Sequence, residues 1–140
     1  MILILAEKPS LARNITAAIG GMKKRDGYYE GAQYIVTWAF GHLFSLADIE
    51  DYNPAPQECR HWTMDNLPCF PKKYKFVLRK GSDKQVDSGV ARQFETIKAL
   101  CNRPDVDTIY VCTDSGREGE YIYRLVAQMA GVKDKHQKRV

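Results

Sequence analysis

Two short apolar runs predict buried strands in this chain. Residues 1–6 read MILILA, and residues 108–112 read TIYVC. A continuous apolar run of this length is typical of a central strand in a parallel sheet, where helices cover both faces. Each run ends at polar residues, so we predict that each strand stops there and leads into a helix.

Apolar residues recur at helical spacing in three other stretches, at about residues 9–19, 83–101 and 118–130. Pro9 opens the first predicted helix and Gly20 ends it. Ser82 and Asp83 are expected to cap the second helix, and Val86 is expected on its apolar face.

The chain between the first two predicted helices reads as an antiparallel insertion. Residues 23–27 are predicted to form a polar turn. Residues 28–30 and 33–38 then form a tight hairpin through Gly31 and Ala32. Residues 49–73 hold most of the prolines together with Trp62, which indicates a long ordered loop rather than a linker.

The order of the elements predicts the fold class. A further strand at residues 74–78 completes the series strand, helix, antiparallel insertion, strand, helix, strand, helix. This order predicts an α/β domain whose central sheet is mostly parallel, with helices on both faces. We therefore expect one domain over residues 1–140, with a hairpin and loop insertion at about residues 28–73 and a basic tail at residues 133–139.

Composition narrows the class of protein. Hydrophobic residues make up 44% of the chain and charged residues 27%, which is ordinary for a globular domain. A net charge of +4 mildly favours a polyanionic partner. No apolar run approaches the roughly 20 residues that span a bilayer, and the opening apolar run is too short for a signal peptide. We therefore expect a cytoplasmic protein without a membrane partner.

The four cysteines do not form a metal or redox motif. No pair has the C-x-x-C spacing that zinc sites and redox motifs use. We expect all four to be reduced, with Cys101 and Cys112 at least partly buried.

Acidic residues follow both predicted buried strands. Glu7 and Lys8 come after the first strand, and the run DSGREGE, with Asp114, Arg117 and Glu118, comes after the second. Strand-to-helix junctions of a parallel sheet share one rim, where ligands bind. Mg²⁺ prefers oxygen ligands and takes one or two carboxylates plus a phosphate, so these residues suit a phosphodiester substrate. The alternative is that the second cluster only places acid in the first turn of a helix.

Three motifs together resemble the type IA DNA topoisomerases, and bacterial topoisomerase III in particular. They are AEKPSLA at the start, VTWAFGHL at residues 36–43 and TDSGREGEYIYR at residues 113–124. The resemblance covers nearly the whole chain. It implies a Toprim domain, which has a Rossmann-like α/β fold. It also implies an enzyme that cuts one DNA strand through a tyrosine, passes a strand through the gap and reseals it.

The resemblance also implies roles for individual residues. Glu7 would donate a proton to the leaving 3′ oxygen, and Lys8 would stabilise the charged transition state. Asp114 and Glu118, together with Glu7, would form an Mg²⁺ site. Two further residues, Arg117 and His42, are expected to contact the single-stranded DNA, although for His42 the orientation of its loop is the favoured role. Tyr28, Tyr29 and Trp38 could stack on bases, but packing in the hairpin is the expected role of each.

Two departures from the family pattern modify this expectation. The usual run is Asp-x-Asp-x-Glu, and here Gly116 replaces the middle Asp, which puts tight metal binding in doubt. None of the eight tyrosines has the Tyr-Pro-Arg-like context of the family's nucleophile. We therefore expect a fragment that is inactive alone, its partner domains and the catalytic tyrosine lying in missing C-terminal parts of the same protein.

Two other functions remain open. One is another Toprim enzyme, such as a primase or a nuclease, which would share the acidic sites. The other is a non-catalytic DNA-binding module, in which the Gly116 change marks lost chemistry. The intact pair of Glu7 and Lys8 argues against the second.

Overall fold

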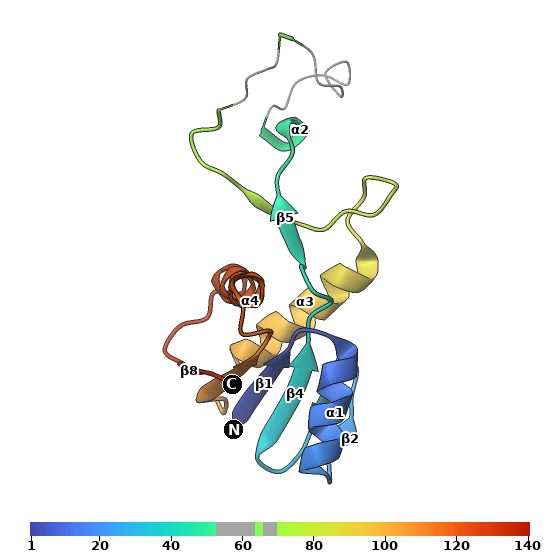
Figure 1. The fold of residues 1–140 in the computed structure, drawn as a ribbon, viewed down its shortest axis with the longest axis vertical. Coiled ribbons are helices and arrows are strands. Elements are labelled where there is room, and N and C mark those ends of the chain that lie inside the picture. Colours follow the sequence, from blue (N-terminus) through green and yellow to red (C-terminus); the bar gives the residue numbers. More distant parts are fainter. Residues whose placement is uncertain (53–63, 66–69) are drawn as a thin grey trace.

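The computed structural model describes residues 1–52, 64–65 and 70–140, and it has a six-stranded sheet with helices on both faces (Figure 1). The strands are β1 (Ile2–Ala6), β2 (Lys23–Lys24), β3 (Tyr28–Glu30), β4 (Tyr34–Trp38), β5 (Phe44–Leu46), β6 (Phe76–Leu78), β7 (Thr108–Cys112) and β8 (His136–Arg139). The helices are α1 (Pro9–Ile19), α2 (Ile49–Tyr52), α3 (Ser88–Cys101) and α4 (Arg117–Ala130).

The main sheet has the order β2-β3-β4-β1-β7-β8. β1 pairs in parallel with both β4 and β7, and β7 pairs in parallel with β8. β2 and β3 pair antiparallel at the other edge, and β3 and β4 form the predicted hairpin. The prediction of a mostly parallel α/β sheet is therefore confirmed.

Side chains of the central strands alternate between two apolar layers. Leu3 and Leu5 of β1 are fully buried in a cluster with residues of α3 and α4, whereas Ile4 of the same strand lies in a second cluster with Ala12 of α1. Burial of one such leucine contributes about 1.5–3 kcal/mol relative to an exposed one. Because both faces are covered, β1 must be apolar at every position, which explains the unbroken run MILILA.

The second predicted helix begins later than expected. Its N-cap is Asp87, whose side chain accepts hydrogen bonds from the backbone N–H groups of Gly89 (2.9 Å) and Val90 (3.2 Å). The carboxylate of Asp83 instead accepts from Gln85 in a local turn, and Val86 lies before the helix with 46% of its surface exposed. The prediction of a cap at Ser82 and Asp83 was wrong because an acidic residue satisfies a turn as readily as a helix end.

Two segments predicted as irregular are strands at the sheet edges. Residues 23–24, predicted as part of a turn, form β2, and residues 136–139, predicted as a tail, form β8. The side chains of both strands are exposed. Edge strands are held by backbone hydrogen bonds, so their side chains carry no apolar signal, and lysines on such edges also discourage aggregation.

A second, two-stranded sheet joins β5 to β6, of which only β6 was predicted. Phe44 of β5 packs edge-on against Phe94 of α3, with ring centroids 4.7 Å apart. Most of the predicted loop at 49–73 lies outside the described residues, including Trp62. Within it, α2 is a short helix that the sequence pattern did not predict.

The cysteine predictions can be checked at two positions. Cys101 is buried and Cys112 is half-buried, and both are free thiols, as predicted. Burial raises the pKa of the Cys101 thiol to about 12, so this group stays protonated at neutral pH. Cys59 and Cys69 lie outside the described residues. In the part of the chain that the structure describes, no helix has the length and apolar character needed to cross a bilayer.

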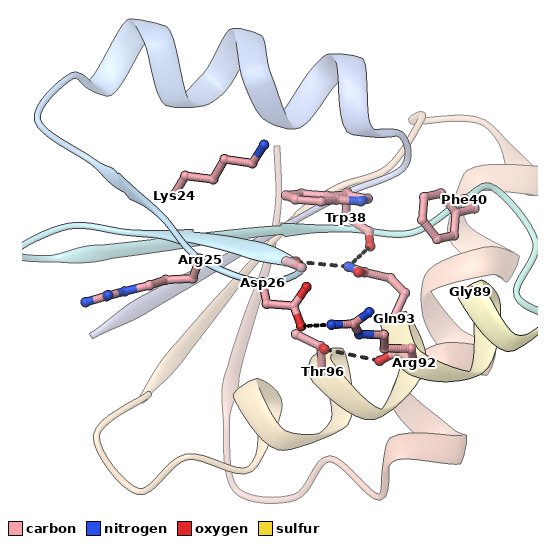
Figure 2. A pocket seen from close by; sticks show the side chains of 10 residues that line it. Lys24, Arg25, Asp26, Trp38, Phe40, Gly89, Arg92, Gln93 and Thr96 are labelled. Atoms are coloured by element: carbon pink, nitrogen blue, oxygen red, sulfur yellow. Dashed lines mark hydrogen bonds and ion pairs between the residues drawn. The ribbon is translucent and has the colours of Figure 1, made fainter.

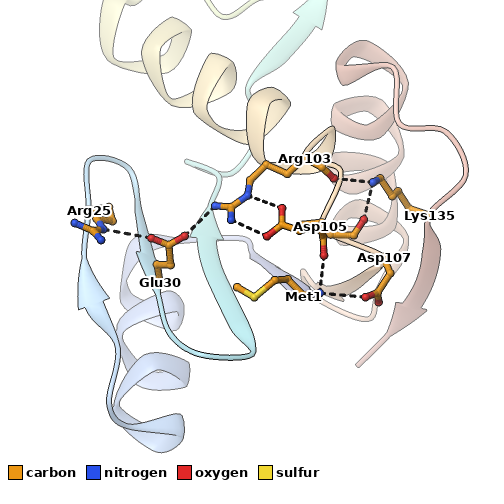
Figure 3. Close-up of polar contacts among 8 residues, drawn as sticks. Met1, Arg25, Glu30, Arg103, Asp105, Asp107 and Lys135 are labelled. Atoms are coloured by element: carbon orange, nitrogen blue, oxygen red, sulfur yellow. Dashed lines mark hydrogen bonds and ion pairs between the residues drawn. The ribbon is translucent and has the colours of Figure 1, made fainter.

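A polar network closes the sheet at the amino ends of the parallel strands (Figure 3). The guanidinium of Arg103 donates to Glu30 of β3 (2.9 Å) and, through two nitrogens, to Asp105 (2.9 and 2.8 Å). The amino group of Met1 donates to the carbonyl of Asp105 (2.6 Å), and Lys135 donates to the carbonyl of Arg103 (2.9 Å). These contacts connect β3 and the segment before β8 to the start of the first strand, at the end opposite the predicted site.

Candidate functional site

The candidate site lies at the carboxyl ends of the three central strands. β1, β4 and β7 end level with one another, because Ala6 is in register with Trp38 on one side and with Cys112 on the other. The residues that follow each strand therefore share one rim of the sheet. This rim brings together the three motifs that the sequence separates by as many as a hundred residues.

Glu7 connects the loops that follow the three strands. Its side chain is 11% exposed, and its Oε2 accepts a hydrogen bond from the backbone N–H of Asp114 (3.0 Å). Its backbone carbonyl accepts from the N–H of Gly41, in the loop after β4 (3.1 Å). The Nζ of Lys8 lies 4.0 Å from the other carboxylate oxygen and is largely exposed. The carboxylate of Glu7 is thus held by the neighbouring loop and faces a cation.

The Asp114 loop packs closely on the start of α4 because of a glycine. A Cβ atom at Gly119 would lie 2.1 Å from the carbonyl oxygen of Asp114, which no side chain permits. The buried hydroxyl of Thr113 also donates to the carbonyl of Gly119 (2.8 Å). Sequence reasoning did not single out Gly119 or Thr113. One sequence signal could have identified Gly119. Glycine has a low helix propensity, so a glycine in the first turn of a helix indicates that something packs closely against it.

Glu118 and His42 contact each other across the rim. The Nε2 of His42 lies 3.1 Å from Oε1 of Glu118, and the His42 ring lies 5.8 Å from that of Tyr121. The side chain of Glu118 is 79% exposed. This contact joins the loop after β4 to α4, and the role of His42 stays a prediction.

The structure places the predicted carboxylates on one rim of the sheet, but their side chains do not converge on one point. Glu7 is held at the Asp114 backbone, the Asp114 side chain is exposed, and Glu118 is turned towards His42. Among the residues that the structure describes, no three His, Cys, Asp or Glu side chains form a group that could hold a metal ion by themselves. The assignment of Glu7, Asp114 and Glu118 to a metal site stays a prediction.

Arg139 of β8 is a further residue of the rim that the sequence did not reveal. Its guanidinium donates to the carbonyls of Thr113 (2.8 Å) and Asp114 (3.3 Å), and it forms an ion pair with Glu120. Hydrogen bonds from Arg124 and then from Arg139 lower the pKa of Glu120. Glu120 is therefore paired with Arg124 and Arg139. Arg139 also binds the backbone of the Asp114 loop and so fixes its position.

Gly116, the position that departs from the family pattern, has room for a side chain. It is the N-cap of α4, with a φ of −73°, and a Cβ atom there would meet no atom within 4 Å. An aspartate would therefore fit without strain and could cap the helix. Arg117 follows it and is exposed on the same rim.

Comparison with known proteins identifies the family of the chain. The family model described as "Toprim domain" matches residues 2–140. The chain is 46% identical over 131 residues to the DNA topoisomerase 3 of Staphylococcus epidermidis, which covers 94% of the chain and 17% of the relative. It is 42% identical over 130 residues to the DNA topoisomerase 3 of Bacillus subtilis, covering 93% of the chain and 16% of the relative. The chain thus spans less than a fifth of the length of these relatives.

Proposed function

The chain belongs to the Toprim domain family, and we propose that it is the single Toprim domain of a type IA DNA topoisomerase similar to the topoisomerase 3 enzymes. In this proposal the whole enzyme cuts one DNA strand and reseals it, and so relaxes or decatenates DNA. The hydrogen bond between Glu7 and the Asp114 backbone supports the proposal most directly, because it unites two acidic loops beside Lys8 on the ligand-binding rim of the sheet.

Glu7 is proposed to act as the general acid of strand cleavage. As a tyrosine oxygen attacks the phosphorus, its phenolic proton passes to water, the bond from phosphorus to the 3′ oxygen breaks, and the carboxyl proton of Glu7 moves to that oxygen. The reverse transfer accompanies religation. Lys8, whose Nζ lies 4.0 Å from the Glu7 carboxylate, would stabilise the negative charge on the phosphate. The burial of Glu7 keeps its carboxyl group in one orientation.

The donor set fits an Mg²⁺ ion that is bound partly by its substrate. Mg²⁺ in such sites takes one or two carboxylates and fills its other positions with water and phosphate. In this proposal Glu7 and Asp114 would supply the carboxylates, and Glu118 would join them after breaking its contact with His42. When bound, Mg²⁺ would neutralise phosphate charge near Lys8.

The proposed partners are a single-stranded DNA segment and further domains of the same protein. Arg117 and His42 lie on the rim, where they could contact the DNA backbone. The nucleophilic tyrosine is proposed to lie in a further domain. Tyr123 of α4 is a poor candidate because it lies in the core and burial raises the pKa of its phenol. Since DNA is the proposed substrate, we also propose a cytoplasmic location.

The proposal is tested in a chimera in which this chain replaces the matching 130 residues of the Bacillus subtilis relative. Glu7→Gln should slow single-turnover cleavage of labelled single-stranded DNA by about 10²–10⁴-fold, because the amide cannot transfer the proton. DNA affinity should change little. Glu95→Gln, an exposed change of the same chemistry on α3, is the matched control and should cleave normally.

Two results would contradict the proposal. One is wild-type cleavage by the Glu7→Gln chimera, which would remove Glu7 from the mechanism. The other is Mg²⁺-dependent DNA hydrolysis by the 140-residue chain alone, which would favour a nuclease. The chain alone is expected to form no covalent DNA adduct on a denaturing gel.

A further inference from the structure

A cavity opens on the same rim, on the side of β4 away from β1. It has a volume of about 310 Å³ and lies between the turn that precedes β3, the end of β4 and the first turns of α3 (Figure 2). Phe40 lines this cavity, and both of its neighbours in the chain are hydrogen-bonded to the candidate site. The backbone N–H of Ala39 donates to the carbonyl of Ala6 (2.9 Å), and the backbone N–H of Gly41 donates to the carbonyl of Glu7 (3.1 Å).

The lining of this cavity combines a cation with an aromatic ring. Arg92 contributes positive charge and Phe40 contributes a ring, whereas Lys24 and the ring of Trp38 lie on the α1 side of the sheet (Figure 2). The guanidinium of Arg25 is paired with Glu30. Phe40 is 38% exposed and the side chain of Arg92 is 74% exposed, so both are accessible to a ligand. Trp38 is half-buried, and its ring packs on Tyr29 at 5.7 Å between centroids. Aromatic faces beside cations are the recognition chemistry of single-stranded nucleic acid.

A buried polar network fixes the shape of the cavity. The amide nitrogen of Gln93, a residue only 6% exposed, donates to the carbonyls of Gly27 (3.0 Å) and Trp38 (2.8 Å). Thr37 also donates to the carbonyl of Gly27 (2.9 Å). Gly27 has a φ of +78°, and a Cβ atom there would lie 2.8 Å from the Gln93 side-chain oxygen. The turn, the strand end and α3 are therefore held in one arrangement before any ligand binds.

We propose that this cavity binds a nucleotide of the single-stranded DNA next to the one held at Glu7 and Lys8. Its base would stack on Phe40, and its phosphate would contact Arg92. This inference rests on the proposed function, because it assumes that the strand passes the rim beside Glu7. A paired base would not offer its face, so the site selects single strands.

Asp26 competes with the phosphate for Arg92 in this arrangement. Its carboxylate lies 2.6 Å from the Arg92 guanidinium, and both side chains are 74% exposed. A phosphate oxygen would have to replace this carboxylate and would also be repelled by it. Removal of the Asp26 charge should therefore strengthen DNA binding, a gain that a misfolded variant could not produce.

The test measures fluorescence anisotropy of a labelled oligothymidylate with the 140-residue chain at low salt. Phe40→Ala should weaken binding about fivefold or more through lost stacking. Arg92→Gln should weaken it and reduce the slope of log affinity against log salt by about 0.7, the value for one lost phosphate contact on a single strand. Asp26→Asn should tighten binding about two- to fivefold.

Each variant has a control of matched chemistry outside the cavity. Tyr74→Ala removes an exposed aromatic ring, Lys98→Gln removes a cation from the other end of α3, and Asp134→Asn removes an exposed carboxylate from the loop before β8. These controls should leave affinity nearly unchanged. Circular dichroism establishes that every variant is folded.

The outcomes separate this inference from the proposed function. The cavity proposal is overturned if the parent chain does not bind the oligonucleotide, or if the cavity variants behave like their controls. It is also overturned if inorganic polyphosphate competes as well as the oligonucleotide and Phe40→Ala has no effect, because the cavity would then be only a basic patch. If the cavity variants behave as expected while Glu7→Gln leaves chimera cleavage unchanged, the DNA contact stands and the catalytic proposal fails.

Discussion

Gly119→Ala is the smallest change that should disturb the candidate site. The new methyl group would lie 2.1 Å from the carbonyl oxygen of Asp114 and 2.7 Å from its nitrogen. Ordinary van der Waals contact needs about 3.5 Å, so α4 and the loop must separate by roughly 1 Å or more. That movement would stretch the buried bond from Thr113 to Gly119 and pull the Asp114 N–H away from Glu7.

The expected change in the free energy of unfolding combines two destabilising effects with one stabilising effect. Overpacking of this kind costs about 1–3 kcal/mol. Weakening the Thr113 hydrogen bond costs about 1 kcal/mol more. Alanine in place of glycine in a helix returns about 1 kcal/mol. We therefore expect Gly119→Ala to lower the free energy of unfolding by about 1–3 kcal/mol, in a position where alanine would otherwise stabilise.

The assay is urea unfolding followed by circular dichroism, with Gly116→Ser as the control. Serine at this N-cap meets no atom within 4 Å and should be neutral or stabilise by a few tenths of a kcal/mol. If Gly119→Ala is as stable as the parent chain, then Asp114 does not pack on α4 as described. The account of how the rim places Glu7 would then fail with it.

Two further predictions concern metal binding and pH. Gly116→Asp should strengthen Mg²⁺ binding and enlarge the metal-induced rise in melting temperature within that variant, because it adds a carboxylate where the backbone has room. A metal site here would be ruled out if Mg²⁺ raised the melting temperature equally in the parent chain and in Gly116→Asp, and if Asp114→Asn did not change that rise. The hydrogen bond from Arg103 lowers the pKa of Glu30 below its ordinary 4.5, so this contact stabilises the fold above that pH and is lost as pH falls through the lowered value. Arg103→Gln should therefore lower the free energy of unfolding at pH 7, measured in urea, and should lower it less at pH 3. The exposed change Arg13→Gln is the control and should show no such pH dependence. A loss of stability in Arg103→Gln that is the same at both pH values would contradict the ion-pair account.

The sequence predicted the central elements well because each carries a local signal. Strand β1 is apolar throughout because two layers of side chains cover it, and Pro9 and Gly20 bound α1 as expected. The acidic motifs follow β1 and β7 directly, so their position on one rim could be inferred from the strand order alone. The prediction of Cys101 as a buried, reduced residue was also correct.

The features that the sequence did not predict have one physical origin. Each depends on contacts with residues that are distant in sequence. β8 exists because β7 offers a free edge for backbone pairing, and its polar residues give no sign of it. Arg139 therefore could not be connected with Thr113 and Asp114. The helix cap failed for a similar reason, since Asp83 and Asp87 are equally good caps until the chain's path selects one.

Sequence alone thus determined the fold class, the family resemblance and the residue types available for chemistry, because apolar periodicity and short motifs are local properties. Tertiary structure decided how those residues are used. It holds Glu7 at the Asp114 backbone, turns Glu118 towards His42, and requires a glycine at 119 for close packing. These contacts join separate loops, and their geometry depends on the register of three parallel strands, which no local pattern encodes.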